Sequence, residues 1–215
     1  MSGGDEQRVR ALYDGRADGY AEFAAARTGY PAHVARFLEA HARPGGRVLD
    51  VGCGPGNLTA HLDGAVAVSG LDLSPRMIAL ARRARPAGTW EVGSFHRPFP
   101  PALAPPFDAV LMIGSFEFCE DLPGVIGRLA GAARPGGALL LGITERADDE
   151  PPALELPAPD VEGRPLAVQR FTPGEMQAAF SGAALEPIRC EHVHGWTHAA
   201  GAAVTYALWV LRKPR

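Results

Sequence analysis

The chain contains few cysteines and no long apolar segment. Its three cysteines, Cys53, Cys119 and Cys190, lie far apart and form no C-x-x-C pair. This spacing argues against a disulfide framework or a zinc site, and it favours reduced thiols. No apolar run approaches the roughly 20 residues of a membrane helix, and the first residues lack the apolar centre of a signal peptide. We therefore expect a cytoplasmic protein without a membrane partner.

Strong charge of either sign is also missing. The formal net charge is −3 over 215 residues, and the sequence pI is about 6.2. Such a balance gives no general attraction to nucleic acid, so we expect none as a partner. The basic run at 82–85 is more typical of a solvated helix end than of a phosphate-binding patch.

Glycines are plentiful, and three of them mark the most informative stretch, residues 47–59 (RVLDVGCGPGNLT). Its apolar beginning predicts a buried strand, which ends at Gly52, Gly54 and Gly56. Residues 57–62 then have the periodicity of a helix opening. Because glycine permits positive φ and lets a ligand approach the backbone, a strand, glycine turn and helix predict a nucleotide-type site.

Buried strands alternate with helices of 10–15 residues along most of the chain, which is typical of a parallel sheet covered on both faces. We expect an α/β fold with a Rossmann-like, doubly wound, seven-stranded sheet. It should be mostly parallel, with an antiparallel C-terminal strand pair. The strands are predicted at 47–51, 65–71, 90–92, 107–113, 138–143, 188–194 and 202–211, and the helices at 8–26, 32–42, 75–84, 121–133 and 173–180.

A length of 215 residues suits a single domain, here 1–215. Residues 1–45 are expected to form an N-terminal helical cap. Between 145 and 170 the sequence contains many prolines and shows no clear period, so we interpret this segment as an inserted loop or lid. The proline-rich run 97–106 is predicted to be a loop with little regular structure.

Two classes of nucleotide-type cofactor are possible for the glycine loop, and the dinucleotides are one of them. The dinucleotide fingerprint is G-x-G-x-x-G, and Asn57 stands where its third glycine would fall. Both classes expect an acid about 20 residues later for the ribose hydroxyls, and Asp72 ends the second predicted strand. A glycine pattern alone is weak support for a cofactor site, whereas the glycines, the acid and the strand ends together are considerably stronger support.

Four motifs carry a family resemblance: VLDVGCGPG at 48–56, LDLS at 71–74, FDAV at 107–110 and RPGGAL at 134–139. With them the sequence closely resembles the class I S-adenosylmethionine-dependent methyltransferases, in particular the small single-domain (methyltransferase type 11-like) branch with small-molecule acceptors. Their order and spacing agree from about residue 8 to the C-terminus. The resemblance implies S-adenosyl-L-methionine as cofactor and S-adenosyl-L-homocysteine as product.

The resemblance also implies a cofactor site. Asp72 would accept both ribose hydroxyls, and Asp50 would orient the loop and the donor's ammonium group. Leu73 and Met77 would line the adenine, although Met77 is equally well explained as a core residue. The implied cofactor-binding residues are Tyr20, Asp50, Gly52, Cys53, Gly54, Asn57, Asp72, Leu73, Met77, Gly93, Ser94, Phe95, Ile113 and Gly114.

One motif departs from the family. After the third strand the family commonly has Gly-Asp-Ala, whose Asp receives the adenine amino group, whereas this chain has Gly93, Ser94 and Phe95. Ser94 can still accept a hydrogen bond, but without charge. Adenine contact is therefore expected to be weaker, while donor binding as a whole is still expected.

The acceptor site is expected beyond the fourth strand, at 113–118. Tyr13 and Tyr20 could close over the donor or simply pack between helices. A general base is required only if the acceptor must lose a proton. The candidates are His96, Glu117 and His194, each with an alternative role as a solvated or structural side chain. The acceptor atom, oxygen, nitrogen or carbon, is left open.

The cluster of Cys190, His192, His194 and His198 could be interpreted as a metal site, but the acids needed for a magnesium-assisted, catechol-type site are not obvious nearby, and we expect no metal. Two rival functions remain. One is a non-catalytic S-adenosylmethionine-binding module that regulates or scaffolds a partner, and the other is a nicotinamide-dependent reductase. The expected partner is a small-molecule methyl acceptor, and the expected state is a monomer or homodimer.

Overall fold

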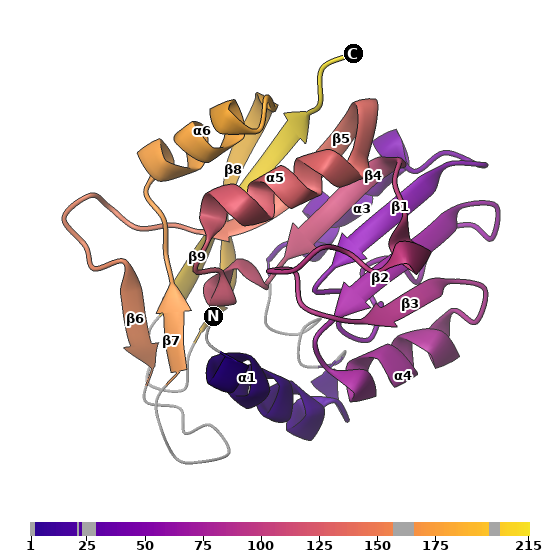
Figure 1. The fold of residues 1–215 in the computed structure, drawn as a ribbon, viewed down its shortest axis with the longest axis horizontal. Coiled ribbons are helices and arrows are strands. Elements are labelled where there is room, and N and C mark those ends of the chain that lie inside the picture. Colours follow the sequence, from indigo (N-terminus) through magenta and orange to yellow (C-terminus); the bar gives the residue numbers. More distant parts are fainter. Residues whose placement is uncertain (1–2, 21, 23–28, 157–165, 198–202) are drawn as a thin grey trace.

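The computed structural model describes residues 3–20, 22, 29–156, 166–197 and 203–215. Within these residues, helices cover both faces of a central sheet (Figure 1). The strands of that sheet are β1 (Arg47–Val51), β2 (Ala67–Asp72), β3 (Thr89–Val92), β4 (Phe107–Ile113), β5 (Ala133–Thr144), β8 (Glu186–Thr197) and β9 (Ala203–Arg212). The helices are α1 (Gly3–Arg16), α3 (Pro31–His41), α4 (Pro75–Ala84), α5 (Leu122–Ala132) and α6 (Pro173–Gly182).

The seven strands lie in the order β3-β2-β1-β4-β5-β9-β8. The strands from β3 to β5 are mutually parallel, and β9 runs antiparallel to both β5 and β8. The predicted fold class, a Rossmann-like doubly wound sheet with an antiparallel C-terminal pair, is therefore confirmed. The strand order reverses between β1 and β4, and open α/β sheets bind ligands at the carboxyl ends of the strands at such a point.

Two buried cores hold the sheet from opposite sides. In β1, Leu49 and Val51 belong to the core that contains α5 and α6, whereas Val48 belongs to the core that contains α3 and α4. In Figure 1, α5 and α6 lie across the near face of the sheet, and α3 lies behind it. Since side chains alternate along a strand, β1, β2, β4, β5 and β9 contribute to both cores, and the strand ends rest on a rigid base.

One local prediction is wrong, because residues 57–62 do not form a helix. The backbone N–H groups of Thr59 and Leu62 bond to carbonyl oxygens only three residues earlier, each at 3.2 Å. The segment is therefore a run of turns between Gly56, whose φ is +78°, and the turn at Asp63. So few residues cannot repay the nucleation cost of a helix. The glycine loop is thus not followed directly by a helix N-terminus that could bind a pyrophosphate.

The first predicted helix is also shorter than expected. Helix α1 ends at Arg16 rather than continuing to residue 26. Gly19 then adopts a φ of +82°, a conformation outside the helical region. Residues 21 and 23–28 of the predicted helix lie outside the described part of the chain.

The predicted lid segment contains regular structure. Strands β6 (Ala153–Leu156) and β7 (Leu166–Gln169) pair antiparallel, separate from the main sheet. Strand β7 lies against the short 3₁₀ turn Phe116–Phe118 that follows β4. The segment therefore reaches the end of the sheet where ligands bind. Its middle part, 157–165, lies outside the described residues.

Candidate functional site

A pocket of about 790 Å³, part of it open to solvent, lies at the carboxyl ends of β1 to β4. All of the predicted cofactor residues except Asp50 line it: Tyr20, Gly52, Cys53, Gly54, Asn57, Asp72, Leu73, Met77, Gly93, Ser94, Phe95, Ile113 and Gly114. The structure thus gathers into one cavity residues that are scattered over almost 100 positions in the sequence.

The glycine loop forms the floor of the pocket. Gly52 and Gly54 adopt φ angles of +70° and +53°, which L-residues rarely tolerate. Gly52 has a second constraint, because a Cβ atom there would lie 1.9 Å from the hydroxyl oxygen of Ser115. The backbone N–H groups of Gly52 and Cys53 both donate to the carbonyl of Leu71, at 2.7 and 3.0 Å. These bonds fix the loop against the end of β2.

Asp72 connects the loop to the next helix. Its carboxylate accepts the N–H of Gly54 on one oxygen and the N–H of Ser74 on the other, each at 2.8 Å. Each carboxylate oxygen has further lone pairs, and the side chain lines the pocket, so both oxygens can accept ligand hydroxyls as well. Burial raises the pKa of Asp72 to about 6, although the backbone hydrogen bonds oppose this.

Asp50 lies outside the pocket lining. Its side chain is only 1% exposed, and neither carboxylate oxygen has a hydrogen-bond partner. Burial, assisted by the neighbouring charge of Asp72, raises the pKa of Asp50 to about 7. The predicted orienting role toward the donor is not supported by any contact in this structure, and it stays a prediction.

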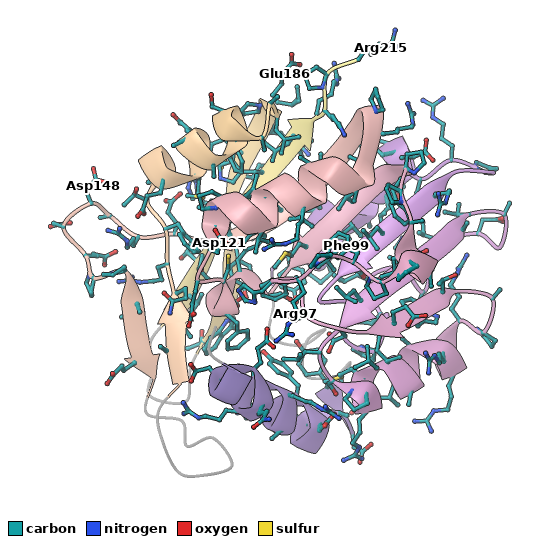
Figure 2. All side chains as sticks on the ribbon, in the orientation of Figure 1. Arg97, Phe99, Asp121, Asp148, Glu186 and Arg215 are labelled. Carbon is teal, nitrogen blue, oxygen red and sulfur yellow. The ribbon has the colours of Figure 1, made fainter. Side chains whose placement is uncertain are left out.

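Helix α1 covers the pocket, and the polar contacts that hold it there were not predicted from the sequence. Val9 and Tyr13 line the cavity from this helix. Near its start, the Glu6 carboxylate accepts a 2.5 Å hydrogen bond from the hydroxyl of Ser94 and lies 3.5 Å from the guanidinium of Arg97. In Figure 2, Arg97 lies on the loop that faces α1. The Ser94 hydroxyl, which was expected to contact the adenine, is therefore hydrogen-bonded to α1.

The other end of α1 is bonded to the start of α4. The Asp14 carboxylate accepts the Ser74 hydroxyl at 2.5 Å and the backbone N–H of Arg76 at 3.2 Å. Ser74 itself is the N-cap of α4, since its hydroxyl oxygen accepts the N–H of Met77 at 3.0 Å. Polar contacts at both ends thus hold α1 across the cavity.

Aromatic rings surround the end of the pocket beyond β4. The ring of Tyr13 lies 5.8 Å from that of Tyr20 and 5.9 Å from that of Phe118, both edge-on. Tyr30, from the segment before α3, lines the same wall. The acceptor site expected at 113–118 therefore coincides with an aromatic wall. No sequence pattern linked Tyr30 to this wall, because it reaches the wall only through the docking of α3.

The three candidate bases lie in different surroundings. His96 lines the pocket, and burial lowers its pKa, so the neutral imidazole is favoured. Its Nε2 lies 3.4 Å from the backbone N–H of Glu120 and accepts from it. Glu117 is 3% exposed and lies behind the lining rather than in it. His194 is exposed on β8 and contacts the hydroxyl of Thr197 at 3.2 Å, outside the pocket.

The histidines of β8 do not converge on a metal. His192 contacts the Glu145 carboxylate at 3.0 Å, and His198 lies outside the described residues. In the described part of the chain, no group of three or more His, Cys, Asp or Glu side chains is placed to hold a metal ion. Among the same residues, no helix is long and apolar enough to cross a membrane.

The fold and the glycine-loop pocket define a class I methyltransferase-like protein. A sequence profile described as a methyltransferase domain matches residues 20–189. The chain therefore belongs to the methyltransferase domain family, and the resemblance to class I S-adenosylmethionine-dependent methyltransferases is confirmed.

Individual relatives agree with this assignment. A malonyl-[acyl-carrier protein] O-methyltransferase of Enterobacter lignolyticus is 32% identical over 142 residues, which are 66% of this chain and 55% of that protein. A trans-aconitate 2-methyltransferase of Methylobacterium nodulans is 33% identical over 106 residues, covering 48% of this chain and 40% of the relative. The matches thus span about half the length of these relatives.

Solved structures share the fold. An S-adenosylmethionine-dependent methyltransferase of Methanosarcina mazei superimposes with a TM-score of 0.67 at 16% identity. The superposition covers 83% of this chain and 97% of that one. At this identity the likeness concerns the fold alone.

Proposed function

We propose that this chain is an S-adenosylmethionine-dependent methyltransferase that transfers a methyl group to an oxygen, nitrogen or carbon atom of a small molecule. The observation that carries this proposal is the arrangement of Asp72 against the glycine loop, within one pocket. Two backbone N–H groups orient its carboxylate at the end of β2. A carboxylate in that position is the natural acceptor for a pair of ribose hydroxyls, with charge-assisted hydrogen bonds.

The residues of the pocket would bind and align the two reactants. Gly52 and Gly54 leave room for the donor at the loop, and Asp72 would hold its ribose. Leu73 and Met77 provide an apolar wall for the adenine. The donor supplies an already activated sulfonium methyl group, so the protein's main contributions are alignment and the exclusion of water. Helix α1 and the aromatic wall are placed to exclude water.

A proton must be removed only from some acceptors. His96 is the one candidate base that lines the pocket, and its lowered pKa leaves it neutral near pH 7. To take a proton, its Nε2 would exchange the 3.4 Å hydrogen bond from the Glu120 N–H for one from the acceptor. We therefore propose His96, rather than His194, as the general base where one is needed. Its carboxylate neighbour Glu6, with an oxygen 3.8 Å from Nδ1, would favour the protonated form once it arises.

We do not assign to this chain the acceptors that appear in the names of its relatives. Malonyl and trans-aconitate groups carry carboxylates, which proteins commonly pair with Arg or Lys. Among the described residues that line the pocket there is neither Arg nor Lys, and Asp72 already contributes a negative charge. A carboxylate acceptor would therefore need a cation from elsewhere in the protein.

A second candidate function is a non-catalytic module that binds the same donor and regulates or scaffolds a partner. The glycine loop and Asp72 serve both functions equally. The presence of a cavity that continues past the donor residues to the aromatic wall at Phe118 favours an enzyme, since a second reactant needs space there.

Labelling in cell extract tests the proposal even while the acceptor is unidentified. The protein would be incubated with methyl-labelled S-adenosylmethionine and small-molecule extract of its source cell, and products would be analysed by mass spectrometry. We expect at least one compound to gain the label with wild type and not with Asp72→Ala. Tight donor binding without any labelled product would favour the non-catalytic module.

A further inference from the structure

The four tyrosines of the chain, Tyr13, Tyr20, Tyr30 and Tyr206, gather around one buried carboxylate. They come from α1, the segment after it, the segment before α3, and β9. The first three line the pocket, and the rings of Tyr30 and Tyr206 lie 6.0 Å apart. The carboxylate belongs to Glu117, and we refer to these five residues as the tyrosine–Glu117 cluster.

Glu117 is buried with an incomplete set of hydrogen bonds. Its Oε1 accepts the hydroxyl of Tyr206 and the indole N–H of Trp196, the latter at 3.2 Å. Its Oε2 is buried and has no hydrogen-bond partner. Burial raises the pKa of Glu117, against the effect of these two donors. An anion in such a position is further stabilised when a compensating positive charge arrives.

The cluster is close to the reacting end of the pocket. A Cβ atom on Gly114, which lines the cavity, would lie 3.7 Å from the hydroxyls of both Tyr30 and Tyr206. The ring of Tyr20 would lie 3.6 Å from a Cβ on Gly54 of the glycine loop. After burial, the charge of Glu117 is the next largest factor that raises the pKa of Tyr13. The cluster therefore extends from the donor loop to the aromatic wall.

We propose that the tyrosine–Glu117 cluster is a subsite for positive charge, which favours the sulfonium form of the donor over the uncharged thioether of the product. This inference rests on the proposed function, since it assumes that the donor occupies the pocket. Tyrosine faces attract cations, and the buried carboxylate adds a Coulomb attraction that water screens only weakly. Product, which lacks the charge, would be released more readily.

A purely structural role for Glu117 makes a different prediction. If its carboxylate only anchored Tyr206 and Trp196, its loss would weaken donor and product binding by the same factor. If the charge of Glu117 attracts the sulfonium, its loss instead changes the ratio of the two affinities. The ratio is therefore the informative quantity, and it requires no acceptor.

The test compares S-adenosylmethionine with S-adenosylhomocysteine by calorimetry on the full chain. Wild type would be measured beside Glu117→Gln, which retains the shape but loses the charge, and beside Glu186→Gln. Glu186 is exposed at the far end of β8 from the pocket and is labelled in Figure 2, so it provides a matched control. Tyr13→Leu is a second variant that leaves Glu117 intact.

We expect Glu117→Gln to reduce the preference for the sulfonium form by about tenfold, or about 1.4 kcal/mol. Tyr13→Leu should reduce it by about threefold, and Glu186→Gln should leave it unchanged. An unchanged ratio in Glu117→Gln and Tyr13→Leu would overturn the inference, and if Glu117→Gln does not fold, Tyr13→Leu alone decides. If wild type binds neither ligand, the proposed function itself fails, which is a distinct result.

Discussion

At the scale of single residues, Asp72 has both a structural and a ligand-binding assignment. Its replacement by Ala should weaken S-adenosylhomocysteine affinity at least tenfold, about 1.4 kcal/mol or more, because the ribose would lose two charge-assisted hydrogen bonds. Calorimetry measures this loss. Since the pKa of Asp72 is about 6, wild-type affinity should also fall as the pH drops through that value.

The exposed residue Asp148, labelled at the edge of the molecule in Figure 2, provides the control. Asp148→Ala should keep wild-type affinity. Because Asp72 also accepts the N–H groups of Gly54 and Ser74, thermal melts must accompany the titrations. Unchanged affinity in a folded Asp72→Ala protein would refute the ribose assignment.

Asp50 should make stability depend on pH. Folding raises its pKa from 3.8 to about 7, so the folded state favours the protonated carboxyl. Its contribution to the free energy of unfolding is therefore complete below about pH 4 and is lost as the pH rises through 7. A difference of about three pKa units corresponds to roughly 4 kcal/mol at full ionisation.

Asp50→Asn cannot ionise and should be more stable than wild type at pH 8. The difference should shrink steadily towards pH 4. Urea unfolding at a series of pH values measures both curves. Parallel curves for the two proteins would show that Asp50 is compensated in solution by a group or water that hydrogen-bonds its carboxylate.

At the scale of elements, β6 and β7 are the part most easily separated from donor binding. None of the side chains that the structure describes in these two strands lines the pocket, but β7 lies against Phe116–Phe118 at the acceptor end. We propose that the segment 145–170 is a lid for the acceptor. Replacing 155–167 by Asn-Gly retains the strand pairs of Ala153 and Leu154 with β7, because this dipeptide favours a tight hairpin turn.

This shortened hairpin should bind S-adenosylhomocysteine within about twofold of wild type. Turnover of the acceptor found by labelling should fall at least tenfold, since water and acceptor are no longer confined. Steady-state kinetics with the labelled donor measure the second effect. If binding and turnover both survive, the segment is not a lid.

At the scale of the whole molecule, donor binding should stabilise the complete fold. The pocket takes residues from α1, β2, α4 and β4 and from the loops after β1 and β3, so a ligand there contacts both the N-terminal helix and the sheet. S-adenosylhomocysteine at one hundred times its Kd should add about 2.7 kcal/mol, which raises the Tm by roughly 5–10 °C for a chain of this size.

NAD at the same concentration should leave the Tm unchanged. The loop lacks the third fingerprint glycine, and no helix N-terminus follows it at 57–62. Differential scanning fluorimetry with the two ligands makes the comparison. A shift with NAD alone would restore the reductase hypothesis.

The wrong predictions and the missed residues have different causes. The turns at 57–62 and the end of α1 at Arg16 depend on local backbone conformations, such as the positive φ of Gly56 and Gly19, which apolar periodicity does not report. Val9 and Tyr30 carry no motif, and they reach the pocket only because α1 and α3 dock there. Nothing near Glu117 in the sequence indicated Tyr206 or Trp196 as its partners.

The strand pattern, the glycine turn and the position of Asp72 at the end of β2 could be predicted from the residues alone. Those features follow from side-chain periodicity and backbone φ preferences, which act between near neighbours. The folded chain was needed to show that Glu6 and Asp14 hold α1 over the pocket, that Asp50 is isolated, and that four tyrosines gather near Glu117. These depend on contacts between residues far apart in the chain, which are fixed when the two cores pack against the sheet.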